Sequence, residues 1–207
     1  LGLSERDVVM PIVPMFHVNS WGLPYAALLT GSGLVLPGPN MTPKALVTLL
    51  ADHKVTVTAG VPTIWMGIAP LLGDYDLSGL RIILSGGSAV PTALSQRYLR
   101  AIGVPITQIW GMTETSPVAT LCTPRTHHEG LSEDERLRVQ ARQGPPVPLV
   151  QLRVCDPATG AEVPWDNSST GEVQAAGPWI ASAYYESTDP ATASDDGRHT
   201  ATGPLAR

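Results

Sequence analysis

A short segment near the middle of the chain combines an aromatic ring, a glycine, a hydroxyl and a carboxylate. It runs from Trp110 to Glu114 and follows a β-like run at residues 105–109. The hydroxyl of Thr113 beside the carboxylate of Glu114 suits phosphate oxygens and Mg²⁺, which prefers one or two carboxylates together with substrate phosphates. Trp110 offers a surface on which a base can stack, and Gly111 allows close approach of the backbone. Two interpretations remain open: a phosphate and cation site, or a buried strand end followed by an acidic helix N-cap.

A second segment with chemical potential lies upstream. Residues 81–84 form an apolar strand pattern that leads into the turn Ser85-Gly86-Gly87-Ser88-Ala89, and Pro91 is placed to open a helix. Two further segments, residues 14–22 and 58–65, complete a set of four motifs in a fixed order.

These motifs need a scaffold, and the chain alternates strand patterns with helical ones. This alternation predicts βαβ units with right-handed crossovers and a parallel sheet with flanking helices, an α/β fold. Ligands of such sheets bind beyond the carboxyl ends of the strands, where both turns fall. The expected strands are residues 8–14, 34–36, 55–59, 81–84 and 106–110, and the expected helices include residues 19–29, 63–72 and 92–101.

One further helix has a clear start signal. Thr42 is a suitable N-cap and Pro43 suits the first helical position. Its predicted apolar face consists of Ala45, Leu46, Leu49 and Leu50.

The character of the chain changes after residue 124, so that residues 1–124 form the predicted α/β subdomain. Residues 125–146 are a polar linker, with an exposed helix at 131–137 capped by Ser132. Residues 147–186 predict a small β subdomain, because 149–155 and 171–177 have strand patterns and 156–160 a turn pattern. Residues 187–207 form a tail that is poor in core residues.

Composition excludes several classes of protein. With 207 residues, of which 43% are hydrophobic and 15% charged, the chain can bury a core. A net charge of -5 argues against a nucleic-acid partner. No apolar run approaches the roughly 20 residues that span a bilayer, and the start lacks a signal-peptide pattern. Cys122 and Cys155 are too few for a disulfide framework, so we expect reduced thiols in a cytoplasmic protein.

The order and spacing of the four motifs resemble those of the AMP-forming acyl-CoA synthetases, members of the adenylate-forming enzyme superfamily. The chain is most similar to the medium- and long-chain fatty-acid–CoA ligases, from about Leu3 to about Glu186. This resemblance implies activation of a fatty acid with ATP to an acyl-adenylate, followed by transfer to coenzyme A. It implies ATP/AMP, Mg²⁺ and coenzyme A as cofactors or co-substrates.

The resemblance also implies roles for individual residues. Thr113 should contact the AMP phosphate, Glu114 should hold the magnesium ion, and Trp110 should lie against the adenine. Gly111 and Met112 should form the wall between the nucleotide and the acyl group. The other face of the base should be lined by the backbone of Gly86, Gly87, Ser88 and Ala89.

The two remaining motifs, at residues 14–22 and 58–65, contain the residues that the resemblance implies for binding the acyl group. His17 and Trp21 match positions that border the carboxylate and the mouth of the acyl tunnel, and a helix starting after His17 would place them on one face. The alternative is a structural histidine at a strand end. Gly60, Val61 and Thr63 should line the tunnel, although Val61 also suits a plain core position. The adjacent histidines His127 and His128 are expected on a solvated loop rather than at a metal.

Several departures from the family pattern affect the expected activity. The Ser/Thr/Gly-rich phosphate loop and the lysine-bearing C-terminal domain are absent, so we expect a central fragment of a longer enzyme that is inactive alone. Pro204 stands where relatives carry a ribose-binding aspartate, and Pro145 and Leu149 stand where relatives often have arginine and glycine. Two alternatives remain: a non-catalytic fragment or pseudoenzyme that binds adenylate or acyl ligands, and an enzyme that adenylates aryl or amino acids. Against the latter, no aspartate occurs between Asp7 and Asp52 to hold a substrate amine.

Overall fold

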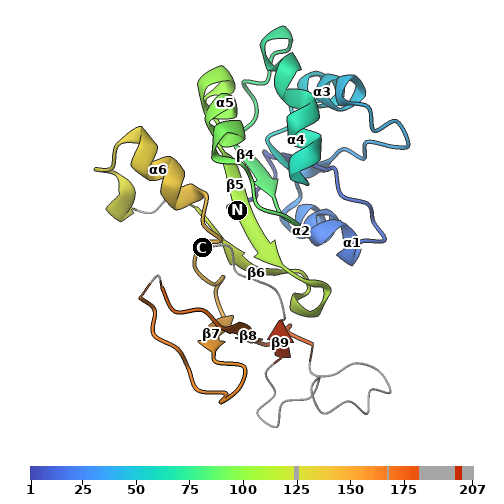
Figure 1. Cartoon of the computed structure of the whole chain (residues 1–207). Coiled ribbons are helices and arrows are strands. Elements are labelled where there is room, and N and C mark those ends of the chain that lie inside the picture. The colour runs from blue at the N-terminus through green and yellow to red at the C-terminus, as the bar shows by residue number, and fades with distance from the viewer. Residues whose placement is uncertain (124–125, 167, 182–198, 202–207) are drawn as a thin grey trace.

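The structure is a computed structural model that describes residues 1–123, 126–166, 168–181 and 199–201 (Figure 1). Its main sheet has six strands in the order β2-β1-β3-β4-β5-β6, and every neighbouring pair is parallel except β5 and β6. The predicted α/β fold with a parallel sheet is therefore confirmed, while the antiparallel edge strand β6 was not predicted. The strands are β1 (Val8–Pro11), β2 (Gly33–Leu34), β3 (Val57–Gly60), β4 (Ile82–Ser85), β5 (Ile106–Gly111) and β6 (Val118–Leu121).

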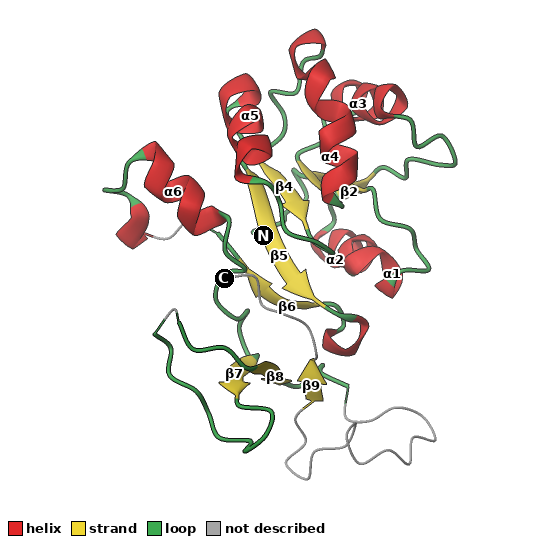
Figure 2. Ribbon diagram, viewed as in Figure 1, coloured by secondary structure: helices red, strands yellow, loops and turns green. Residues whose placement is uncertain are grey.

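Helices cover both faces of this sheet (Figure 2). One face packs against α3 (Pro43–Asp52), α4 (Pro62–Ile68) and α5 (Thr92–Ile102), and this core includes Trp65 and Tyr98. The other face packs against α2 (Leu23–Thr30) through Leu23 and Ala27. The remaining helical segments are α1 (Val18–Trp21), α6 (Glu133–Gln140) and the 3₁₀ turns η1 (Ala69–Asp74), η2 (Thr113–Thr115) and η3 (Thr126–His128).

Helix α3 begins as its sequence predicts. The hydroxyl of Thr42 accepts a hydrogen bond from the backbone N–H of Ala45 at 3.4 Å, and Pro43 occupies the first turn. Leu46 and Leu50 of the expected apolar face are buried. The third buried residue is Val47 rather than Ala45 or Leu49.

The helix expected over residues 19–29 begins instead at Leu23. Residues 18–21 have φ angles between 44° and 56° and form a left-handed turn. Pro24 explains the difference, because a proline fits the first turn of a helix but removes a hydrogen bond and clashes further along it. The buried hydroxyl of Ser20 donates to the carbonyl of Val13 and anchors the turn.

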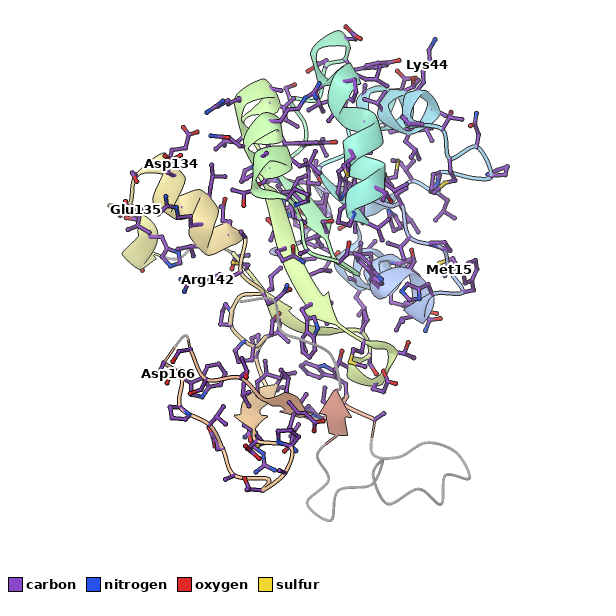
Figure 3. The ribbon with its side chains drawn as sticks, viewed as in Figure 1. Met15, Lys44, Asp134, Glu135, Arg142 and Asp166 are labelled. Atoms are coloured by element: carbon purple, nitrogen blue, oxygen red, sulfur yellow. The ribbon has the colours of Figure 1, made fainter. Side chains whose placement is uncertain are left out.

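The polar stretch after β6 contains the predicted capped helix. The hydroxyl of Ser132 accepts from the N–H of Glu135, and the Glu135 carboxylate accepts from the N–H of Ser132, so that α6 starts with a capping box. Asp134 and Glu135 project from the start of α6 away from the sheet (Figure 3). Beyond α6 the chain returns to β6, where the Val147 N–H donates to the Ala119 carbonyl.

The small β subdomain is an antiparallel sheet of β7 (Gln151–Cys155), β8 (Glu172–Ala176) and β9 (His199–Ala201). The predicted turn after β7 is confirmed, because the side chain of Asp156 accepts from the N–H groups of Ala158 and Thr159. Within the predicted tail, residues 187–198 and 202–207, including Pro204, lie outside the described residues. The boundaries proposed for the subdomains, at residues 124, 146 and 186, stay predictions.

A network of charged and polar groups ties together the amino ends of the parallel strands. Asp7, 6% exposed, accepts hydrogen bonds from the Arg81 guanidinium at 2.8 Å and from the Thr56 hydroxyl at 2.7 Å. These three residues directly precede β1, β4 and β3. The hydrogen bond from Arg81, reinforced by those from Thr56 and the N–H of Ser4, holds the pKa of Asp7 well below its usual range. Asp7 is therefore a paired carboxylate that stabilises the fold.

Candidate functional site

Three loops meet at the carboxyl edge of the sheet. The ends of β3, β4 and β5 are neighbours, since Gly60 pairs with Ser85 and Ser85 pairs with Gln108. A Cβ atom on Gly86 would lie 2.8 Å from the Ile109 side chain, and one on Gly87 would lie 3.5 Å from the Val61 side chain. The glycine turn after β4 therefore lies between the loop after β3 and the end of β5.

The predicted nucleotide-binding residues of this turn differ in exposure. Gly86 is buried against β5 with no room for a side chain, and Gly87 has a φ of 81°, which favours glycine. Ser88 and Ala89 are exposed. In this turn, therefore, Gly86 is buried against the sheet and the outer residues Ser88 and Ala89 are exposed.

The second turn is fixed by Gly111 and by Thr115, a residue to which the sequence motifs gave no role. Thr115 is 1% exposed, and its hydroxyl accepts from the Met112 N–H at 2.7 Å. The same hydroxyl lies within hydrogen-bonding reach of the carbonyls of Met112 and Pro117. A side chain on Gly111 would overlap the Pro117 carbonyl, so only glycine fits there. Thr115 and Gly111 together close the turn that carries Thr113 and Glu114.

The residues that would touch a nucleotide lie on the outer side of this turn. Thr113 is exposed, and none of the described groups hydrogen-bonds to its hydroxyl. Glu114, Trp110 and Met112 are half-buried. The backbone carbonyl of Glu114 accepts from the Ala181 N–H at 2.8 Å, which brings the segment after β8 against η2. The motif turn therefore lies where the main sheet meets the small β subdomain.

At the end of β3, Gly60 is packed against a tryptophan, and Val61 and Thr63 beyond it are exposed. The indole N–H of Trp65 donates to the Gly60 carbonyl at 3.2 Å, and its ring fills the space beside Gly60. Val61 is 37% exposed and Thr63 is also exposed, so these two predicted tunnel residues are accessible from the carboxyl edge.

His17 and Trp21 follow β1, the neighbour of β3, but they are not joined by a right-handed helix. The expectation that a helix places them on one face is wrong, because residues 18–21 are left-handed. Trp21 packs partly against the core on the α2 side of the sheet, and His17 is exposed. Met15 projects from the same loop (Figure 3). Their proposed contact with an acyl carboxylate stays a prediction.

The donors at the carboxyl edge are hard oxygen atoms. The Glu114 carboxylate and the Thr113 hydroxyl sit on one turn, and such oxygens suit Mg²⁺ when substrate phosphates supply the other ligands. Within the ranges that the structure describes, no three His, Cys, Asp or Glu side chains gather into a metal site. A magnesium ion here would therefore depend on the oxygen atoms of its phosphate ligand.

A hollow of about 180 Å³ lies elsewhere, on the small β sheet, and includes none of the predicted site residues. It is lined by Gln151, Leu152, Arg153, Glu162, Gln174 and Ala176. None of the helices in the described part of the chain is long and apolar enough to cross a membrane.

A mostly parallel sheet with glycine and hydroxyl–carboxylate turns at its carboxyl edge is typical of α/β proteins that bind nucleotides. The sequence matches the AMP-binding enzyme family over residues 1–185, and the chain belongs to this family. The resemblance drawn from the four motifs is thereby confirmed.

Individual relatives agree with this assignment. The chain is 51% identical over 185 residues to a long-chain-fatty-acid–CoA ligase of Thermus thermophilus, covering 88% of this chain and 34% of that protein. It is 41% identical to a medium-chain-fatty-acid–CoA ligase of Ectopseudomonas oleovorans, covering 94% and 36%. The solved structure of a long-chain-fatty-acid-CoA ligase from Archaeoglobus fulgidus superposes with a TM-score of 0.74 at 27% identity, covering 90% of this chain and 37% of that one. The chain thus spans about a third of the length of these relatives.

Proposed function

We propose that this chain forms the adenylate-binding part of an AMP-forming fatty-acid–CoA ligase. The main support is the meeting of the glycine turn and the Thr113–Glu114 turn at the carboxyl edge of one sheet. The names of the two curated relatives support a fatty acid as substrate and coenzyme A as acceptor.

In the proposed reaction, a fatty carboxylate oxygen attacks the α-phosphorus of ATP and pyrophosphate leaves with the bonding electrons. The coenzyme A thiolate then attacks the acyl carbonyl carbon, forming the thioester and releasing AMP. Such transfers depend mainly on positioning and on neutralising charge at oxygen atoms. The magnesium ion that accompanies ATP would supply part of this neutralisation.

Each residue of the site has a role in holding the substrates. The Thr113 hydroxyl binds an α-phosphate oxygen, and the Glu114 carboxylate holds the ion. Trp110 lies against one face of the adenine and the backbone of residues 86–89 against the other. His17, Trp21, Gly60, Val61 and Thr63, with Gly111 and Met112 as the dividing wall, border the acyl group and its carboxylate.

Binding by the 207-residue chain tests the adenylate site directly. We expect saturable binding of AMP, and tighter binding of a non-hydrolysable dodecanoyl-adenylate analogue because it fills both subsites. Calorimetric titration measures both affinities. A folded chain that binds neither ligand would overturn the proposal.

A chimera tests turnover, because the chain spans about a third of the length of its relatives. Residues 1–185 would replace the matching segment of the Thermus thermophilus ligase. We expect the chimera to exchange pyrophosphate with ATP when a fatty acid is present, and Glu114→Ala to abolish the exchange. Undiminished magnesium-dependent exchange in that variant would remove Glu114 from the site. A chimera that binds adenylate but never turns over would favour the binding-only alternative.

A further inference from the structure

Gln108 is a buried polar residue in the middle of strand β5. It is 2% exposed, and its carboxamide accepts a hydrogen bond from the Val90 N–H at 2.8 Å. The amide nitrogen of Gln108 donates to the Ser88 carbonyl at 3.3 Å and to the Ile109 carbonyl at 3.2 Å. One side chain of β5 therefore binds two backbone groups of the loop that follows β4.

These bonds reach a stretch that lacks regular structure. Helix α5 begins at Thr92, so the Val90 N–H lies outside its hydrogen-bond ladder. Pro91 has no N–H, and its side chain offers no cap. The carboxamide of Gln108 supplies the acceptor for this buried N–H, which precedes the helix.

The backbone of Gln108 is itself held from both sides. On one side it pairs with Ser85 of β4, and on the other its carbonyl accepts from the Cys122 N–H at 3.0 Å. The carboxamide therefore projects from a fixed point in the sheet.

The alternation of side chains along β5 relates Gln108 to the proposed adenine site. Residues two apart in a strand project from the same face, and β5 keeps a regular register with β6 through Trp110. Gln108 and Trp110 therefore share one face of the sheet, and Gln108 holds residues 88–90 on that face.

We propose that Gln108 is a positioning residue that fixes the distance between the glycine turn and Trp110, the two surfaces between which the adenine binds. This inference rests on the proposed function. Gln108 does not contact the ligand in this scheme. It acts through the loop, whose backbone would otherwise shift away from the indole.

A positioning role predicts that loss of the Gln108 amide lowers affinity only for ligands that carry the adenine base. Gln108→Met keeps a similar volume without the polar atoms, and we expect it to weaken AMP binding about tenfold or more. Ribose 5-phosphate lacks the base, so its affinity should stay within about twofold of the wild-type value. General damage to the fold would weaken both ligands alike, and this result would overturn the inference.

Ser95→Ala is a matched control. Ser95 of α5 likewise contacts β5 through a buried polar side chain. Its hydroxyl accepts from the Ile106 N–H at 3.0 Å, at the opposite end of the strand from Trp110. We expect this variant to lower thermal stability and to leave AMP affinity within about twofold. An equal loss of AMP affinity in both variants would contradict a specific role for Gln108.

Hydrogen exchange of the wild-type chain provides a test that needs no variant. The Val90 amide should exchange far more slowly than the amides of the exposed residues Ser88 and Ala89. Exchange at the same rate would overturn the inference even if Gln108→Met failed to fold. If the wild-type chain bound no AMP, the proposed function would fail, and this inference would fail with it. Unchanged AMP binding by Gln108→Met would refute this inference alone.

Discussion

The two edges of the parallel sheet use polar groups in opposite ways. At the amino edge, Asp7, Thr56 and Arg81 bind one another, and the carboxylate of Asp7 is nearly removed from solvent. At the carboxyl edge, the buried side chains of Gln108 and Thr115 bind backbone groups behind the turns. The Thr113 hydroxyl remains exposed in front of them.

This difference separates stability from binding within one sheet. Polar groups that satisfy one another contribute to folding and leave nothing for a ligand. Groups on the outer side of a buried support keep their hydrogen-bonding capacity at a defined position. Changes at the amino edge should therefore alter stability alone, and changes on the outer side of the carboxyl edge should alter binding alone.

The largest effect on stability is expected at the amino edge. Asp7→Asn removes the charge that Arg81 binds, and we expect the free energy of unfolding to fall by about 2–3 kcal/mol. AMP affinity should stay within about twofold. Urea denaturation and calorimetric titration measure the two quantities, and a large loss of AMP affinity would break the separation between the edges.

The pH dependence of this effect has a defined sign. The pKa of Asp7 is lowered in the folded state, so its contribution is complete above its ordinary pKa and is lost as the pH falls below about 4. The difference in stability between the wild type and Asp7→Asn should therefore shrink in acid. A difference that grew below about pH 4 would contradict the assignment of Asp7 as a paired carboxylate.

A smaller effect, on both stability and binding, is expected where the carboxyl edge is buried. Gly86→Ala would place a methyl group 2.8 Å from the Ile109 side chain, and we expect a loss of about 1–3 kcal/mol in stability. Because the turn must move, AMP affinity should fall as well. Gly73→Ala is the control, since a Cβ there meets nothing within 4 Å. Unchanged AMP binding by Gly86→Ala would show that the turn does not touch the base.

Two neighbouring threonines sharpen the comparison within a single turn. Thr113→Val should weaken AMP and ribose 5-phosphate about tenfold, equivalent to about 1.4 kcal/mol, with little change in stability. Thr115→Val should instead destabilise the chain by about 1–2 kcal/mol, because it removes the acceptor for the Met112 N–H. Titration and thermal unfolding of both variants measure the contrast. Equal behaviour of the two would contradict the division between outer and supporting residues.

The sequence predicted the sheet and its edge better than the supports behind the turns. Apolar runs and start signals such as Thr42-Pro43 act locally, so their elements could be placed within a few residues. Strand β6 was missed because Ser116-Pro117, a local turn signal between η2 and β6, was not interpreted as a chain reversal. The motifs located Thr113 and Glu114, but not the long-range bonds of Gln108 with residues 88–90.

Two features that were not predicted, the start of α2 and the hydrogen bonds of Gln108, could have been inferred from residue type. Pro24 indicated that the helix after His17 begins near Leu23, since a proline fits only the first turn. A glutamine between Thr107 and Ile109, in the strand that leads into the Trp110–Glu114 segment, indicated a buried amide in need of partners.

The smallest predicted effect lies away from both edges, at Leu149 in the loop before β7. Leu149 has a φ of 70° and is 73% exposed, so a leucine adopts a left-handed conformation without burying its side chain. A residue with a Cβ atom is less stable in this conformation by about 1–2 kcal/mol, whereas glycine adopts it readily. Leu149→Gly should therefore raise the free energy of unfolding by up to about 1 kcal/mol, since added freedom in the unfolded chain offsets part of the gain. Leu149→Ala keeps the Cβ and should change little. Neither variant should alter AMP affinity, and a change there would extend the binding site to the junction with the small β subdomain.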